Sequence, residues 1–481
     1  MSEPARLAAV GAACGSLRLR AADAAEAWGT GSPRGRTAVA APDEDTLTLA
    51  WDAATAARRA VQAGPGDQPG SLTRTEIDGL WWGTSEPPFA DGPSHAVLAA
   101  ALGLSAASTG ALHAGSSHAG VEALLGAADA IHAGTAARAL VIASDAIVPG
   151  TGTALERRAG AAAVALLLER DGPAGIGARV TRTRPALDRY RGAREAVTRD
   201  TYDPRLERDE IILPAVREIV DHLAVFEPTA WSLPDPDGRT SRSVARGLTG
   251  TLVSDAVFST LGDTGAAAAL LGAATALDAS GVVAAVGYGG GRITGILLEA
   301  DAPVPGAASV PITLERGVEA SYAEVLRSRG QLTPHGETVE MGVPPGSAMF
   351  TRGAPEMLGP LGARCVDCGT VNTPPSIHPH CVGCGGSKFD EVDLAETGTV
   401  HTYVVNRTMP APFVAPLPLA VVDLDDGARI MLQVTGDPDG LAVDSRVELV
   451  LRRYAYERGV PVYGYKARLV APPPNTQGGG T

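Results

Sequence analysis

The pattern of apolar and polar positions changes once along the chain. Up to about residue 300, short β-branched runs alternate with longer Ala- and Leu-rich stretches of helical period, which is typical of an α/β domain. The expected strands in this part are Ala139–Ala143, Ala161–Glu169, Val282–Val286 and Thr294–Glu299, and the expected helices are Leu47–Gln62, His95–Leu102, Ala119–Ala133 and Ala266–Leu277.

Beyond residue 300 the apolar runs are shorter and turn residues separate them. A Pro/Ala/Gly stretch over 301–311 reads as a linker, and Tyr322–Arg329 is predicted to be a helix. The last part predicts a small β-barrel. Its expected strands are Thr399–Val405, Leu419–Val422, Ala428–Val434, Arg446–Arg452 and Val460–Leu469.

The α/β part partly repeats itself. The segment Leu124–Ile131 is echoed by Leu270–Leu277, each copy follows a turn of small residues, and each precedes a strand that closes on Leu-Leu-Glu. Ala-rich helices resemble one another by chance, but the matched turns and strands favour an internal duplication.

Four of the five cysteines lie within twenty residues, as Cys365-x-x-Cys368 and Cys381-x-x-Cys384. This spacing is typical of a tetrahedral zinc site rather than of a disulfide framework. Four thiolates leave no open position for a substrate, so we expect structural zinc; redox-active thiols are the alternative. The small module around them should fold together with its metal.

Composition narrows the function further. The 481 residues carry 40 basic and 54 acidic side chains, a formal net charge of −14, which repels nucleic acid and anionic lipid. The apolar stretches are shorter than the roughly 18 residues of a membrane span. The start of the chain has the wrong flanks for a secretory signal. We therefore expect a cytoplasmic protein with no nucleic-acid partner and no membrane span.

Two local motifs allow more than one interpretation. Ser117 precedes a predicted helix, so it is either an N-cap or a nucleophile that the helix N-terminus activates. Adjacent His118 is not thereby its base. The run Gly287-Tyr-Gly-Gly-Gly-Arg292 lacks the Lys-Ser/Thr ending of a phosphate loop and is better explained as a turn with close backbone approach.

Five segments carry motifs of one known family: Gly83–Ala90, Gly115–Gly120, Val225–Pro228, Gly262–Gly265 and Gly287–Arg292. In these motifs the first 300 residues resemble the thiolase superfamily, in particular hydroxymethylglutaryl-CoA synthases and ketoacyl synthase III enzymes. The resemblance implies a duplicated five-layered α/β/α/β/α fold, usually a homodimer, that acts on acyl thioesters of coenzyme A or of an acyl carrier protein. The remainder resembles the zinc-ribbon plus OB-fold proteins that partner thiolase-like enzymes.

These resemblances divide the chain into six parts. The expected parts are an N-terminal thiolase-like half over 1–172, a C-terminal half over 173–302, a linker with a docking helix over 303–359, a zinc ribbon over 360–392, an OB-fold over 393–472 and a disordered tail over 473–481.

The scaffold matches the family, but the catalytic positions differ. By motif position, the family's Cys nucleophile falls on Ser117, its His on Glu227 and its Asn on Asp263. The synthase Glu falls on Ser85, with Glu86 one place later. We expect substrate contacts from Gly289, Gly290, Tyr288 and His118.

The altered residues change the expected chemistry. A serine hydroxyl does not ionise at neutral pH and needs a base beside it, a role that Glu227 would fill. Ionised Glu227 or Asp263 would repel the negative charge that develops on a thioester oxygen, which disfavours ordinary Claisen condensation. Two carboxylates close together would share a proton and supply one acid and one base.

Three functions follow. The first is an acyltransferase or condensing enzyme in lipid or polyketide-type metabolism, with Ser117 as acyl acceptor, Glu227 as base and Asp263 as its partner. The second is a thioester-dependent aldolase or retro-Claisen lyase, in which the two carboxylates move the protons and Ser117 only lines the pocket. The third is a catalytically silent thioester-binding subunit.

Overall fold

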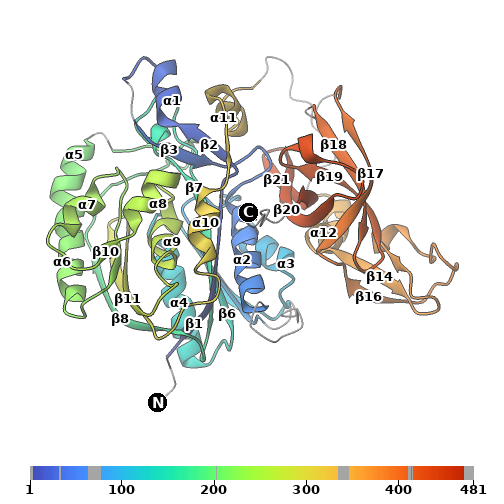
Figure 1. Ribbon diagram of the computed structural model, residues 1–481, viewed down its shortest axis with the longest axis horizontal. Helices are drawn as coiled ribbons and strands as arrows, with labels where there is room; N and C mark the ends of the chain where they lie inside the picture. Colours follow the sequence, from blue (N-terminus) through green and yellow to red (C-terminus); the bar gives the residue numbers. More distant parts are fainter. Residues whose placement is uncertain are drawn as a thin grey trace, which may run out of the picture. The chain divides into compact units, whose positions relative to one another are not determined.

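The chain forms two compact units, residues 1–334 and 335–481. The structure is a computed structural model that describes residues 4–31, 34–62, 77–201, 203–333, 346–409, 413 and 415–470 (Figure 1). The predicted disordered tail over 473–481 lies outside the described residues, as does the part of the predicted linker over 334–345.

Ten strands of the first unit divide into two sets of five. The first set comprises β1 (Arg6–Cys14), β4 (Gly79–Thr84), β5 (Thr109–Ala114), β6 (Ala139–Ala146) and β7 (Ala161–Glu169). The second set comprises β8 (Ala174–Thr183), β9 (Ala230–Ser232), β10 (Thr251–Leu252), β11 (Gly281–Gly289) and β12 (Arg292–Ala300).

The two sets share one topology. Their strand orders are β5-β4-β6-β7-β1 and β10-β9-β11-β12-β8, so each set, numbered along its own half, has the same order. In each set the first two neighbouring pairs are parallel and the last two are antiparallel. This identity of order and direction confirms the internal duplication.

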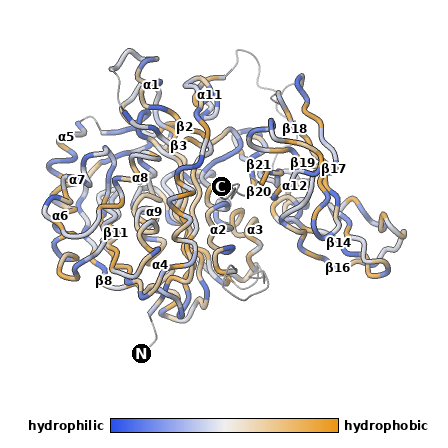
Figure 2. The backbone as a smooth tube through the Cα atoms, viewed as in Figure 1, coloured by the Kyte–Doolittle hydropathy of each residue, from blue (hydrophilic) through white to orange (hydrophobic). Residues whose placement is uncertain are grey.

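Helices cover both faces of each set. Helix α2 (Thr46–Gln62) packs on β1, β6 and β7, and α6 (Leu213–Ala224) packs on β8, β11 and β12. The two sets join at the β1–β8 pair into one ten-stranded sheet, and between the sets lie α4 (Ala119–Ala133) and α9 (Ala268–Ala274), which contact each other (Figure 1). The predicted five-layered thiolase fold is therefore present, with hydrophobic positions concentrated in its central strands and helices (Figure 2).

Small residues let the two central helices approach closely. A Cβ added at Gly120 in α4 would collide with the carbonyl oxygen of Ala266, which lies in the short 3-10 turn (Gly265–Ala267) ahead of α9. Both helices are rich in Ala and Gly because a larger side chain at this contact would force the helices apart. The start of α4 and the turn ahead of α9 consequently lie together.

The first part of the predicted linker is built into the first unit. Helix α10 (Ser309–Glu315) packs on β1, and strand β13 (Val318–Glu319) pairs with β2 (Leu17–Arg20), which pairs with β3 (Arg36–Val39). Helix α11 (Tyr322–Ser328) begins with a capping box between Ser321 and Glu324, and its Val325 packs on Leu19 and Val39. The other described helices of this unit are α1 (Ala21–Ala27), α3 (Ser94–Ala101), α5 (Pro204–Leu206), α7 (Thr240–Ala245) and α8 (Ser254–Leu261).

The second unit contains one helix, a small sheet and a barrel within its described residues. Helix α12 (Ala348–Leu358) precedes a three-stranded sheet of β14 (Leu361–Cys365), β15 (Val371–Asn372) and β16 (Phe389–Asp393). A closed barrel follows, with the order β17-β18-β19-β21-β20, as predicted for an OB-fold. Its strands are β17 (Thr397–Asn406), β18 (Leu417–Leu424), β19 (Arg429–Thr435), β20 (Arg446–Glu457) and β21 (Val460–Leu469).

Across the described ranges, every helix is too short or too polar to cross a membrane.

Candidate active site

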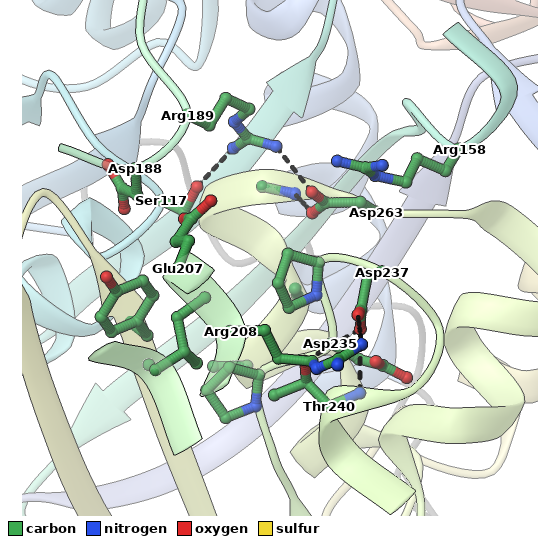
Figure 3. Close-up of a pocket in the computed structure, with 18 of the residues that line it drawn as sticks. Ser117, Arg158, Asp188, Arg189, Glu207, Arg208, Asp235, Asp237, Thr240 and Asp263 are labelled. Carbon is green, nitrogen blue, oxygen red and sulfur yellow. Dashed lines mark hydrogen bonds and ion pairs between the residues drawn. The ribbon is translucent and has the colours of Figure 1, made fainter. Parts of the chain in front are cut away.

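A cavity of about 70 Å³ opens beside the N-terminus of α4. Both halves of the first unit line it, because the shared topology brings the ends of corresponding strands and helices together (Figure 3). Its polar lining consists of Ser117, Arg158, Asp188, Arg189, Asp200, Glu207, Arg208, Asp235, Asp237, Thr240, Asp263 and Tyr288.

Ser117 lies in the turn between β5 and α4, and its side chain reaches the cavity. The hydroxyl that contacts the start of the helix belongs to Ser116, whose Oγ accepts a hydrogen bond from the N–H of His118 at 3.3 Å. Ser117 Oγ instead accepts a hydrogen bond from Arg189 Nη2. The structure thus removes the N-cap interpretation of Ser117.

Arg189 joins Ser117 to Asp263. Its Nη1 donates to Asp263 Oδ2 at 2.7 Å, and the two side chains are only 12% and 10% exposed. Burial disfavours the charge of the guanidinium, but Asp263, Asp145 and Glu86 outweigh burial and raise its pKa. The predicted sharing of a proton between Asp263 and Glu227 is therefore not what the structure shows, because Asp263 pairs with the cation Arg189 instead.

Glu227 is not brought to the site. It is exposed in the turn before β9, with a φ of 52°, and it does not line the cavity. The segment that does line the cavity follows the carboxyl end of β9 and includes Pro234, Asp235 and Pro236. The prediction of Glu227 as the base is wrong because its motif lies at the amino end of β9, whereas sites in such sheets gather at the carboxyl ends.

Ser85 and Glu86 also lie outside the cavity lining. Ser85 donates its N–H and its hydroxyl to buried Asp145, each at 2.7 Å, and Glu86 accepts a hydrogen bond from Thr198 Oγ1. Asp145 in turn accepts a hydrogen bond from Ala266 N at 2.7 Å, which connects the end of β6 to the 3-10 turn ahead of α9. These residues hold the two halves together next to the site, and neither of the two predicted catalytic residues reaches the cavity.

Of the four predicted substrate contacts, Tyr288 alone lines the cavity. Fully buried His118 contacts Thr294 Oγ1 at 2.9 Å and Glu122 at 3.3 Å, so it packs behind the site. Gly289 and Gly290 act through the backbone. A Cβ at Gly289 would lie 2.8 Å from Ser117 N, and Gly290 N donates to Asp188 Oδ2 at 2.8 Å. The prediction of a turn with close backbone approach holds.

Three cavity carboxylates have raised pKa values. Burial raises the pKa of Asp235 to about 6, against a hydrogen bond from Ser241, and it raises the pKa values of Asp188 and Glu207 as well. The Tyr288 hydroxyl is buried without a hydrogen-bond partner in the described residues, and burial next to Asp188 raises its pKa too. Asp235 can therefore accept or donate a proton close to neutral pH.

Sequence reasoning missed several residues of the cavity, among them Arg189, Glu207 and Asp235, and it also missed the neighbouring Asp145. Arg189 comes from the aperiodic stretch between β8 and α5, where several arginines stand close together and no pattern distinguishes one of them. A signal existed for Asp145, because it is a carboxylate at the carboxyl end of an apolar strand. Glu207 begins a π-helical turn (Glu207–Ile212), a feature that often marks functional sites but has no sequence signature here.

The four cysteines of the second unit form a separate site. Cys365 Sγ lies 3.6 Å from Cys384 Sγ, and Cys368 Sγ lies 3.5 Å from Cys381 Sγ. All four sulfur atoms lie within 4.8 Å of one another. Four thiolates around one ion with metal–sulfur bonds of about 2.3 Å would be separated by roughly 3.8 Å, so the cluster fits a tetrahedral metal ion.

Comparisons with known proteins identify both units. A family model described as "ChsH2, C-terminal OB-fold domain" matches residues 391–452. A DUF35 domain-containing scaffold protein of Methanothermobacter thermautotrophicus is 36% identical over 121 residues, which are 24% of this chain and 90% of that protein. The chain belongs to the DUF35 family. Its DUF35 part carries the OB-fold and is fused to a thiolase-like part.

The thiolase-like part has its own relatives. A hydroxymethylglutaryl-CoA synthase of Pyrococcus furiosus is 30% identical over 152 residues, which are 31% of this chain and 41% of that synthase. The solved structure of the curacin pathway HMG synthase, in complex with acetyl donor-ACP, superposes with a TM-score of 0.58 at 19% identity and covers 71% of this chain and 93% of that one. These matches confirm the thiolase-like fold of this DUF35 protein.

The raised pKa of Asp235 predicts a pH-dependent stability. Because its pKa is about 6 in the folded protein and near 3.8 otherwise, the folded state binds the proton more tightly and charged Asp235 destabilises the fold. This penalty is absent below about pH 4 and fully developed above pH 6. Asp235→Asn, which keeps an acceptor for Ser241, should therefore raise the free energy of unfolding at pH 7.5 by about 2 kcal/mol.

Urea unfolding at several pH values checks this expectation. The difference between Asp235→Asn and the native chain should shrink as the pH falls from 6 towards 4. Asp129→Asn, at an exposed ion pair with Arg179, is the control and should show little difference at any pH. A variant at Asp235 that is less stable than the native chain at pH 7.5 would contradict the interpretation.

Proposed function

We propose that this DUF35 protein is an acyltransferase of the thiolase-like kind, which transfers the acyl group of an acyl-CoA or acyl-carrier thioester through Ser117. The observation that carries the proposal is the hydrogen bond from buried Arg189 to Ser117 Oγ, inside a cavity that both thiolase-like halves line. A cation beside a serine oxygen stabilises negative charge on that oxygen, as an activated nucleophile requires.

Arg189 offsets the electrostatic repulsion that Asp263 would otherwise exert on the reacting thioester. Ionised Asp263 alone would repel the charge that develops on a thioester oxygen, but Asp263 is held by Arg189 Nη1 and by the N–H of Gly265 at 3.0 Å. The Arg189–Asp263 ion pair carries little net charge. It holds the N–H donors of Arg189 in a fixed orientation next to Ser117 Oγ, where the thioester carbon would react. A preorganised donor of this kind lowers the barrier to acyl transfer when it lies where negative charge develops.

Glu207 takes the role of base that was expected of Glu227. Its carboxylate points into the part of the cavity that holds Ser117 and Asp188 (Figure 3). Burial raises its pKa, although a hydrogen bond from Thr201 Oγ1 at 2.7 Å opposes that shift. A carboxylate with a raised pKa accepts the proton of a hydroxyl more readily than an ordinary carboxylate does.

The transfer then runs in two balanced steps. Glu207 accepts the hydroxyl proton as Ser117 Oγ bonds to the thioester carbonyl carbon, and Arg189 N–H donors face the oxyanion that forms. The carbon–sulfur bond breaks, and the departing thiolate takes the proton from Glu207. An acceptor nucleophile next attacks the serine ester, loses its proton to Glu207 and releases Ser117 as the hydroxyl.

A lyase is the second candidate, and Tyr288 favours it. Its buried hydroxyl has no hydrogen-bond partner in the described part of the chain, and it lines the cavity near Asp188. In a retro-aldol cleavage, Asp188 would take the proton of a β-hydroxyl group, the adjacent carbon–carbon bond would break, and Tyr288 would return a proton to the thioester carbanion. This route needs no acyl-Ser117.

We also propose a homodimer through the thiolase-like part and structural zinc in the cysteine cluster. Strand β5 ends its sheet, and most of its residues are at least partly exposed, so its backbone groups can pair with another strand. Zinc is proposed because it is the ion that four thiolates in a small module most often hold. A protein acyl carrier is proposed beside coenzyme A as the carrier of the thioester.

Zinc removal gives one test. Purified protein should contain one zinc ion per chain by elemental analysis, and Cys381→Ser should lose it. Because the three strands around the cluster bury few side chains, the variant should expose residues 360–393 to proteolysis. Cys14→Ser, outside the cluster, should keep its metal. A Cys381→Ser protein with full metal content and unchanged proteolysis would refute structural zinc.

Intact mass tests the acyltransferase proposal. Native protein incubated with acyl-CoA thioesters should gain one acyl mass, and Ser117→Ala should gain none. Arg189→Met should slow acylation by about a hundredfold or more, the usual cost of one oxyanion donor. Thioester cleavage that persists in Ser117→Ala, with no mass gain in either protein, would replace the proposal with the lyase. Tight thioester binding without turnover would replace it with the binding subunit.

A further inference from the structure

The cavity around Ser117 has an excess of negative side chains. Six carboxylates line it, from Asp188, Asp200, Glu207, Asp235, Asp237 and Asp263, but only three cationic side chains, from Arg158, Arg189 and Arg208. A reaction site for anionic acyl groups would be expected to show the opposite balance.

Each arginine is already matched by one cavity carboxylate. Arg189 pairs with Asp263 and Arg158 pairs with Asp200, both at 2.7 Å. Arg208 lies 3.6 Å from Asp237, and it also pairs with Asp209 outside the cavity. Among the described residues, three cavity carboxylates form no ion pair with an arginine: Asp188, Glu207 and Asp235.

These three carboxylates are held by neutral donors in the part of the chain that the structure describes. Asp188 accepts from Gly290 N at 2.8 Å, Glu207 from Thr201 Oγ1 at 2.7 Å and Asp235 from Ser241 Oγ at 2.7 Å. Burial raises the pKa of each. A positive charge in the cavity would relieve that desolvation cost and stabilise the ionised carboxylates.

The three carboxylates that form no ion pair among the described side chains do not form a metal site. Within the described ranges, the cysteine cluster is the single group of Cys, His, Asp and Glu ligand atoms that gathers closely enough for one ion. The three carboxylates are instead spread along the cavity, with Asp188 and Glu207 on the side of Ser117, and Asp235 next to Asp237 and Thr240 (Figure 3). This spacing suits an organic cation that extends away from the reacting carbonyl.

We propose that the cavity selects a substrate with a protonated amine remote from the reacting carbonyl, and that Asp235 binds this amine. The inference rests on the proposed function, since it takes the cavity to be an acyl-thioester site. The amine belongs either to the acyl group of the thioester or to the acceptor of that group. Both sources present the same ammonium chemistry to Asp235.

Three coenzyme A analogues of similar acyl length test the first source. In each, an amide nitrogen replaces the thioester sulfur, so that binding is measured without turnover. The acyl groups are 3-aminopropanoyl, butanoyl and succinyl, which end in an ammonium, a methyl and a carboxylate. By titration calorimetry at pH 7.5, the ammonium analogue should bind about tenfold or more tightly than the methyl analogue, and the carboxylate analogue should bind weakest.

Asp235→Asn identifies the residue responsible. It should bind the methyl analogue as the native protein does, but its preference for the ammonium analogue should fall by about tenfold. Loss of folding cannot explain such a result, because this variant is expected to be at least as stable as the native chain. Asp129→Asn, an exposed carboxylate outside the cavity, should keep the full preference.

Acceptors test the second source. With the methyl analogue bound, 1,4-diaminobutane should bind more tightly than 1,4-butanediol if the acceptor carries the amine. A preference for the cation in either series supports the proposal and assigns its source. No preference in both series, tighter binding of the carboxylate analogue, or a preference that Asp235→Asn retains would overturn it. Because these are binding measurements, their outcome is independent of whether Ser117 becomes acylated.

Discussion

A guanidinium group that is withdrawn from water must be matched by carboxylates, and this requirement organises the site. Arg189 is nearly buried and donates to Asp263 on one side and to Ser117 on the other. An unpaired charge in this position would cost several kcal/mol. Asp263 is therefore necessary to the cation, and the cation fixes the electrostatic surroundings of Ser117.

Residues at several of the predicted family positions are connected to this guanidinium. Ser117 and Asp263, which the motif resemblance matches to the family's Cys and Asn, both accept hydrogen bonds from the guanidinium of Arg189. The Ser85 hydroxyl donates to Asp145, whose charge also acts on Arg189. Because these residues contact one another or a shared neighbour, they form one connected polar network.

The fold could be predicted from the sequence because repeated periodic segments define it. The helix at 119–133, the strand at 161–169 and the echo of residues 124–131 in 270–277 all carry local signals that the packing preserves. The metal-type cluster of the four cysteines could equally be predicted, since the spacing of the two Cys-x-x-Cys pairs is typical of four sulfur atoms that lie together. Ser117, Asp263 and Tyr288 followed from motif position and do line the cavity.

The rest of the site could not be predicted, for two physical reasons. Glu227 was misplaced because a short motif cannot reveal on which side of a three-residue strand it lies, and strand β9 carries the site at its other end. Arg189, Asp188 and Asp200 come from a stretch without periodicity between β8 and α5, where tertiary contacts alone decide which side chains point inward. Such a segment has no local pattern that sequence reasoning can use.

A double-mutant cycle on Arg189 and Asp263 tests this central pairing most directly. Asp263→Asn and Arg189→Met, alone and together, would be compared with the native chain by urea unfolding at pH 7.5. We expect each single change to destabilise the protein by about 3 kcal/mol, because it leaves a buried charge unpaired, and the double change to cost much less than the sum, with a coupling of about 2 kcal/mol or more. Additive losses would contradict the account, since they would mean that the two side chains stabilise the protein independently.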